Sequence, residues 1–227
     1  TIGVYTANDS AYWAAVDFAK AGVKVAAIVD LRDNPTGPAF EAAHAAGIEV
    51  LAGRAVVGTT GKLRISTMKV APKAGGAARS IAVDALLTSS GWTPSVHLFS
   101  QSRGKVRFDD ATKRFLPGTY VQDCVCVGSC NGTDDLVEAV SEGAAAGLKA
   151  ARDAGVKGGK PLAIKVDASE SWSGGMLGAG PGAGEGAKAM AFIDFQNDVT
   201  AKDTRQAVHQ GMRSIEHFKR FTTNGMA

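Results

Sequence analysis

The sequence predicts an α/β fold built on a parallel sheet, and the first thirty residues carry most of that prediction. Two apolar segments, 2–6 and 23–30, flank a segment with helical periodicity, 11–21, which ends at Gly22. The second apolar segment ends in the acid Asp30. Strand, loop, helix and strand in this order, with an acid at the tip of the second strand, form the layout of a dinucleotide-binding unit. We therefore expect a Rossmann-like βαβ nucleotide-binding domain.

The loop of this unit lacks the glycines of a dinucleotide site. Polar residues fill Thr6–Ser10, where the pattern G-x-G-x-x-G is expected. Asp9 complements the helix dipole there but would repel a phosphate. Asp30 follows Asn8 at roughly the 20-residue spacing of an acid that binds a ribose hydroxyl. We interpret Asn8, Asp9, Asp30 and Arg32 as a vestigial nucleotide site, and a working site is the alternative.

The segments after Asp30 extend the predicted sheet, and the spacing of the apolar residues then changes to strict alternation with polar residues. Alternating apolar and polar residues around the Gly-Lys pair at 61–62 predict an antiparallel hairpin. We expect a parallel sheet with helices on both faces up to about residue 90, with the meander as a flap. The expected elements are a turn at 31–38, a helix at 39–46, a strand at 48–51, the hairpin at 56–71 and a third meander strand at 80–83.

The second half begins with a buried strand, a polar loop and a helix. Segment 118–128 is rich in valine and ends in glycine, loop 129–133 follows, and an alanine-rich helix spans 134–153. A short strand is expected at 162–166. The glycine-rich stretch Gly178–Gly186 imitates a phosphate loop but ends in an acid, so we interpret it as a flexible linker.

The C-terminal segment predicts a strand and one long helix. The strand covers 191–195, and Thr200 with Asp203 forms a capping-box pattern. Apolar residues then recur at spacings of three and four, which places them on one helix face. These residues are Val208, Met212, Ile215 and Phe218.

Composition gives few functional hints. The 227 residues are 45% hydrophobic and 21% charged, with a formal net charge of +3, so we expect neither a nucleic-acid nor a membrane partner. No apolar run approaches the roughly 18–20 residues that span a bilayer. Three clustered cysteines do not suggest a disulfide framework, so we expect a cytoplasmic protein. Because the chain starts in a predicted strand without Met, we expect a fragment of a longer polypeptide.

The metal-ligating residue types do not form a convincing set. Cys124, Cys126 and Cys130 suggest an iron–sulfur or zinc site, and Cys124 and Cys126 would lie on one face of a strand, where they could share a metal. Zinc requires four ligands, however, and no nearby histidine completes them. We interpret the cysteines as small hydrophobic residues in the core. Three dispersed histidines are interpreted as packing or solvated residues, and they are His97, His209 and His217. Lys219 and Arg220 are interpreted as a basic helix end that suits the helix dipole, with contact to a flavin phosphate or an acidic partner as the alternative.

Two longer patterns resemble known flavoproteins. The order of elements up to the segment 84–94 resembles the nucleotide-binding insert of flavoproteins with two dinucleotide domains. The segment 120–128 with its following loop and helix is similar to the closing strand, turn and helix of the first of those domains. Four further segments resemble the alpha subunit of heterotetrameric sarcosine oxidase, and they lie at 6–12, 90–100, 192–200 and 214–226.

The resemblance implies four parts in this chain. Residues 1–90 would be the nucleotide-binding insert, and 91–155 the returning part of a split FAD/NAD(P)-type dinucleotide domain. Residues 156–190 would be a glycine-rich linker. Residues 191–227 would lead into a folate-binding domain similar to aminomethyltransferases.

It also implies an activity, cofactors and partners. The complex would oxidatively demethylate sarcosine to glycine, with hydrogen peroxide and formaldehyde or methylene-tetrahydrofolate as products. NAD would bind to the alpha subunit, FMN where alpha meets beta, FAD to the beta subunit, and tetrahydrofolate to the C-terminal domain. The partners would be the beta, gamma and delta subunits.

The resemblance further implies a cofactor site at the loop after residue 127. Glycines there allow close backbone approach, and amides at the start of the helix can bind a phosphate or ribose oxygen unless Thr133 is merely an N-cap. Ser129 replaces an aspartate that holds a flavin in relatives, which fits NAD. The predicted NAD-binding residues are Gly128, Ser129, Asn131, Gly132, Thr133 and Asp134.

Two other functions stay open from the residues alone. One is a stand-alone NAD(P)-dependent oxidoreductase that uses the Asp30 site. The other is an interaction module with a dead nucleotide fold. No set of catalytic side chains is recognised in the sequence, which agrees with the resemblance, because the chemistry would then belong to the flavin of the beta subunit.

Overall fold

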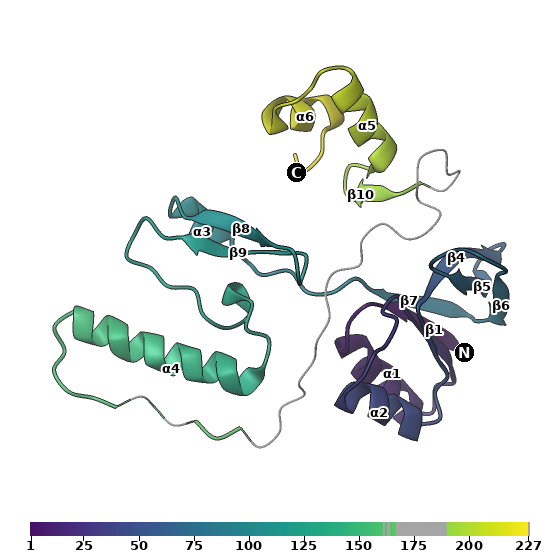
Figure 1. The fold of residues 1–227 in the computed structure, drawn as a ribbon, viewed down its shortest axis with the longest axis horizontal. Coiled ribbons are helices and arrows are strands. Elements are labelled where there is room, and N and C mark those ends of the chain that lie inside the picture. The colour runs from purple at the N-terminus through teal and green to yellow at the C-terminus, as the bar shows by residue number, and fades with distance from the viewer. Residues whose placement is uncertain (161, 163, 167–189, 227) are drawn as a thin grey trace. The chain divides into compact units, whose positions relative to one another are not determined.

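A four-stranded parallel sheet organises the N-terminal part of the chain (Figure 1). Its strands lie in the order β3-β2-β1-β7, and every neighbouring pair is parallel. Their bounds are β1 (Ile2–Thr6), β2 (Val25–Asp30), β3 (Val50–Ala52) and β7 (Ala85–Ser89). The expected Rossmann-like α/β fold is confirmed.

Both helices of this sheet lie on the same face. α1 (Ser10–Lys20) and α2 (Pro38–Ala45) pack against each other and against β1 and β2, where Tyr12 is fully buried. The other face is covered by the antiparallel meander β4 (Arg54–Gly61), β5 (Ile65–Pro72) and β6 (Arg79–Ala82), as Figure 1 shows.

The expected helices on both faces, with the meander as a flap, are therefore wrong. A second buried cluster joins the sheet to the meander, and it consists of Ala27, Val29, Met68, Val70, Ile81 and Val83. Gly3 makes this contact possible, because a Cβ atom there would lie 2.5 Å from the Met68 sulfur. The missing side chain lets the meander pack directly on β1.

The middle part holds a hairpin and a long helix. It contains α3 (His97–Gln101), β8 (Lys105–Asp109), β9 (Arg114–Thr119), the 3₁₀ turn η1 (Gly128–Asn131) and α4 (Leu136–Asp153). The predicted strand at 118–128 is wrong beyond residue 119, since residues 120–127 are irregular. No strand among the described residues pairs with this segment, so its alternating valines have no ladder to join.

The structure, a computed structural model, describes residues 1–160, 162, 164–166 and 190–226. The chain divides into two units, Thr1–Gly178 and Ala179–Ala227. The strand expected at 162–166 is absent at the four described positions of that range. The interpreted linker Gly178–Gly186 lies outside the described residues.

The C-terminal unit contains a two-stranded ladder and two short helices, which are β10 (Phe192–Asp194), β11 (Val199–Thr200), α5 (Ala201–His209) and α6 (Ile215–Thr222). The capping box of Thr200 and Asp203 is confirmed. The single long helix is wrong, because Gly211 adopts a left-handed φ of +86° after α5 and Ser214 caps a new helix.

Candidate functional site

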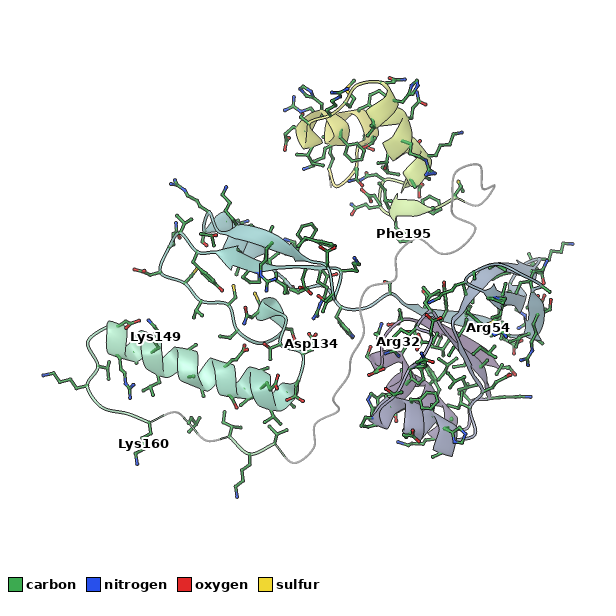
Figure 2. The ribbon with its side chains drawn as sticks, viewed as in Figure 1. Arg32, Arg54, Asp134, Lys149, Lys160 and Phe195 are labelled. Carbon is green, nitrogen blue, oxygen red and sulfur yellow. The ribbon has the colours of Figure 1, made fainter. Side chains whose placement is uncertain are left out.

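The first predicted site is closed by its own side chains. Asp30 is fully buried and accepts hydrogen bonds from the Tyr12 hydroxyl at 2.6 Å and from the Arg32 backbone amide at 2.8 Å. The Arg32 guanidinium bridges Asp30 at 2.8 Å and Asp9 at 2.7 Å. Arg32 lies in the part of Figure 2 that holds α1, α2 and the parallel sheet. Sequence reasoning grouped these acids with Arg32 but missed Tyr12.

The polar and charged side chains of this cluster bind one another. Burial and then the hydrogen bond with the Asp30 carboxylate raise the pKa of the Tyr12 phenol, so Tyr12 remains a donor. Asn8 is also fully buried, and its side-chain amide points at Ser89. An acid that binds a ribose must offer its oxygens to solvent, and Asp30 offers none. The geometry therefore favours the vestigial interpretation over a working site.

The second predicted site is a tight loop whose donors are also engaged. The Gly128 amide donates to Glu142 Oε2 at 2.8 Å, and the Thr133 hydroxyl donates to Glu142 Oε1 at 2.6 Å. The Thr133 hydroxyl, and next the Gly128 amide, lower the pKa of Glu142, so the carboxylate stays ionised. Glu142 stands two turns into α4, and nothing in the sequence pattern singled it out.

An ion pair holds the other end of this loop. Arg114 of β9 and Asp134 pair at 2.6 Å, and both side chains are nearly buried. Figure 2 labels Asp134 in the stretch that connects η1 to α4. The Arg114 Nε atom is buried and has no hydrogen-bond partner in the described part of the chain. Arg114 was missed because the hairpin that carries it was not predicted.

The helix start differs from the prediction as well. α4 begins at Leu136, and Asp135 is the N-cap, accepting a hydrogen bond from the Glu138 amide at 3.0 Å. Thr133 is therefore not the N-cap. Gly128 and Gly132 both have left-handed φ angles, +62° and +86°, so both glycines are needed for the backbone path.

The loop as it stands does not fit a phosphate. The Gly128 amide and the Thr133 hydroxyl already bind the ionised Glu142 carboxylate, whose negative charge would repel a phosphate. Carboxylate oxygens instead accept hydrogen bonds from hydroxyl groups. Of the two oxygens that the sequence prediction allowed, a ribose hydroxyl therefore fits this loop better than a phosphate.

The cysteines do not lie in a core strand. Cys124 is exposed, and Cys126 and Cys130 are partly exposed and carry free thiols. The core interpretation is therefore wrong, and the physical reason is that residues 120–127 join no sheet. Among the described residues, no group of three or more Cys, His, Asp and Glu side chains has the arrangement of a metal site.

The three histidines singled out from the sequence lie in three different helices. His97 starts α3, His209 ends α5, and His217 lies in α6 beside Lys219 and Arg220. Within the described ranges, no helix combines the length and the apolar content that crossing a membrane requires.

Comparison with known proteins shows which proteins this chain is similar to. Residues 188–227 match the family model described as the sarcosine oxidase A3 domain. The sarcosine oxidase subunit alpha of Rhizobium meliloti is 34% identical over 228 residues, which is 100% of this chain and 22% of that protein. The alpha subunits of Corynebacterium sp. strains P-1 and U-96 are also 34% identical, over 98% of this chain and 24% of each relative.

The chain is a relative of the sarcosine oxidase alpha subunits. This confirms the resemblance expected from the sequence, over essentially the whole chain. The chain spans about a quarter of the length of these sarcosine oxidase relatives, 22–24%.

Solved structures confirm the fold. L-proline dehydrogenase from P. horikoshii matches with a TM-score of 0.54 and 14% identity, over 100% of this chain and 40% of that chain. Thioredoxin reductase from T. acidophilum matches with a TM-score of 0.51 and 19% identity, over 67% of this chain and 52% of that chain. This chain therefore shares its fold with parts of L-proline dehydrogenase and thioredoxin reductase.

Proposed function

We propose that this chain supplies nucleotide-binding and scaffold elements to the alpha subunit of a sarcosine oxidase. The complex would oxidise the N-methyl group of sarcosine and release glycine, hydrogen peroxide and formaldehyde or methylene-tetrahydrofolate. The observation that carries this proposal is the 34% identity to sarcosine oxidase alpha subunits over the whole chain. The split into parts at 1–90, 91–155, 156–190 and 191–227 belongs to the same proposal.

The cofactor assignments follow from the same relationship. NAD would contact the loop from Gly128 to Asp134, with FMN between alpha and beta, FAD on beta, and tetrahydrofolate on a domain beyond this chain. Because the loop already binds the Glu142 carboxylate, we assign it a ribose hydroxyl of NAD and not a phosphate. The partners would be the beta, gamma and delta subunits in the cytoplasm.

The two rival functions have less support. A stand-alone NAD(P)-dependent oxidoreductase would need Asp30 open to the cofactor, and Asp30 is fully buried beneath Tyr12 and Arg32. An interaction module with a dead nucleotide fold agrees with that closed site, but it does not account for the glycine-rich loop before α4.

Calorimetry with NAD tests the cofactor assignment. In the full-length alpha subunit, Asn131→Ala and Ser129→Ala should each weaken NAD binding about tenfold, the worth of one hydrogen bond. These variants are preferable to Gly128→Leu, because Gly128 has a left-handed φ and an added Cβ would lie 3.4 Å from Ala139. Asp30→Asn is the control at the first site and should leave NAD bound.

The isolated chain should bind NAD at least about 10³-fold more weakly than the full-length subunit, because contacts from the rest of the dinucleotide domain are missing. Micromolar binding by the isolated chain, lost in Asp30→Asn, would instead favour the stand-alone enzyme. Co-purification of a flavin-bearing partner with the full-length subunit distinguishes the sarcosine oxidase proposal from the interaction module. A full-length subunit that binds neither NAD nor a flavoprotein would contradict the proposal.

A further inference from the structure

Two of the free cysteine thiols lie next to each other at the turn η1. Cys126 precedes this turn and Cys130 lies within it. The two thiols are in hydrogen-bonding contact with each other, and both are partly exposed to solvent. Neither cysteine belongs to the cofactor-binding residues proposed above, so this pair of nucleophilic side chains has no role in that function.

The backbone between the two cysteines is fixed by the fold. Gly128 has a left-handed φ of +62°, which residues with a side chain rarely adopt, so the chain turns sharply between Cys126 and Cys130. The Gly128 carbonyl accepts a hydrogen bond from the Thr133 amide at 3.1 Å, and the Gly128 amide donates one to Glu142 at 2.8 Å. The turn that brings the two thiols together is therefore held from both ends.

Each cysteine has its own partner beside α3. The Cys126 amide donates to the Tyr120 hydroxyl at 3.3 Å, and the Tyr120 ring packs edge-on against the buried Phe99, with ring centroids 4.9 Å apart. The Cys130 thiol donates to the Ser95 carbonyl at 3.3 Å. Burial, followed by the contact with Cys126, raises the pKa of the Cys130 thiol, so Cys130 keeps its proton.

We propose that Cys126 and Cys130 form a redox-active dithiol that hydrogen peroxide oxidises to a disulfide. A thiolate is the nucleophile in such reactions, and an adjacent second thiol is typical of cysteines whose oxidation is reversible. Cys126 makes the first attack, because Cys130 holds its proton. Cys130 then completes the disulfide.

The reaction takes place in two balanced steps. The Cys126 thiolate attacks one peroxide oxygen, an S–O bond forms, the O–O bond breaks, and the departing hydroxide takes up the proton that Cys126 released, which gives a sulfenic acid and water. The Cys130 sulfur then attacks the Cys126 sulfur, the S–S bond forms, the S–O bond breaks, and the departing hydroxide leaves as water with the Cys130 proton. The two thiols lose two electrons, and the peroxide gains them.

Oxidation also removes a contact of the turn. Cys130 can no longer donate to the Ser95 carbonyl once its thiol proton is lost, so η1 loses this hydrogen bond to the segment before α3. Hydrogen peroxide is a product of the reaction proposed above, but the dithiol proposal does not depend on that assignment, because it requires only the two thiols and a peroxide.

Treatment of the 227-residue chain with hydrogen peroxide tests the proposal. The number of free thiols, counted with a thiol reagent after denaturation, should fall from three to one. Mass spectrometry should show a monomer that is lighter by two hydrogen atoms. Dithiothreitol should restore all three thiols, because a disulfide is reduced by thiols whereas a sulfinic acid is not.

Cysteine variants assign the pair. Cys124 is exposed, and its sulfur lies 3.6 Å from the Ser102 hydroxyl, so Cys124→Ser is the matched control. This variant should lose both of its remaining thiols at the rate of the parent chain. Cys126→Ser and Cys130→Ser should give no monomer lighter by two hydrogen atoms.

Three results would overturn the proposal. The first is a Cys124→Ser variant that keeps its two thiols. The second is an intramolecular disulfide in Cys126→Ser or in Cys130→Ser, which would show that Cys124 is one of the reacting thiols. The third is a parent chain that gains oxygen atoms and is not restored by dithiothreitol, which would show that the thiols are oxidised separately.

Discussion

Two tyrosines of the N-terminal part show how a single buried hydroxyl can affect the stability of the fold. The Tyr12 hydroxyl donates to the buried Asp30 carboxylate at 2.6 Å. The Tyr5 hydroxyl is equally buried but has no hydrogen-bond partner within the described residues. A buried hydrogen bond to a charged group stabilises a fold, whereas an unsatisfied buried hydroxyl costs free energy.

Tyr12→Phe should therefore lower the free energy of unfolding by about 1.5–3 kcal/mol. Tyr5→Phe removes the same atom without losing a bond, so it should be neutral or stabilising. Urea unfolding of the two variants beside the parent chain measures both effects. Equal destabilisation by the two substitutions would show that the Tyr12–Asp30 bond is not what stabilises the cluster.

Asp194 gives the C-terminal unit a pH-dependent anchor. Its carboxylate accepts from the Gly225 amide at 2.7 Å and from Asn197 and Gln196. The Gly225 amide, followed by Asn197, lowers the pKa of Asp194 to about 2. A folded-state pKa below the unfolded value means that this stabilisation is complete above about pH 4 and is lost as the pH falls through about 2.

The nuclear magnetic resonance signal of the Gly225 amide should therefore shift with pH, with a midpoint near pH 2. In the Asp194→Asn variant this pH-dependent shift should be absent. Asp198→Asn, four positions later in the same turn region, should leave the titration unchanged. A Gly225 midpoint near 4, the ordinary range of aspartate, would mean that the Asp194 contact does not hold in solution.

At the scale of elements, one close contact lies within the buried cluster that joins the meander to the sheet. Gly3 of β1 has no side chain, and Met68 of β5 occupies that space. Gly3→Ala should lower the free energy of unfolding by about 1–3 kcal/mol, because the new Cβ overlaps the Met68 sulfur.

Met68→Ala alone should cost about 2–5 kcal/mol as a core truncation. The double variant should be more stable than the sum of the two predicts, with a coupling above about 0.5 kcal/mol. A double-mutant cycle by thermal or urea unfolding gives this number. Strict additivity would contradict direct packing of the meander on β1.

At the scale of the whole molecule, the middle part leaves apolar side chains uncovered. Val121, Val125 and Leu136 are each more than half exposed. α4 has no buried residue in the described structure. Exposed apolar side chains that gather into a patch are typical of regions that bind another part or partner.

Replacing Val121, Val125 and Leu136 together by serine should reduce binding of the dye ANS to about half or less, since this dye reports accessible apolar surface. The free energy of unfolding should change by less than about 0.5 kcal/mol per site, because the positions are exposed. Leu63→Ser, at a singly exposed leucine in a meander turn, is the control. Unchanged dye binding in the triple variant would show that these residues form no accessible apolar surface.

Local patterns in the sequence determined the elements whose signals are local. The βαβ unit, the meander, the capping box at Thr200 and the helix at 134–153 depend on periodicity and capping within a few residues, and the relationship to sarcosine oxidase depends on segments along the chain. The hairpin of β8 and β9 was missed, although Val106 and Phe108 alternate before a turn with two aspartates.

Only the tertiary structure decided which groups meet across the chain. Tyr12 closes Asp30, Met68 enters the space above Gly3, and Glu142 and Arg114 hold the loop from Gly128 to Asp134 from opposite sides. These pairs lie 14 to 65 residues apart in sequence, so no local pattern encodes them. The valines of 120–127 predicted a strand because their pattern lies within a single segment. A strand forms only where a neighbouring strand completes its backbone hydrogen bonds, and the pattern does not show whether such a neighbour exists.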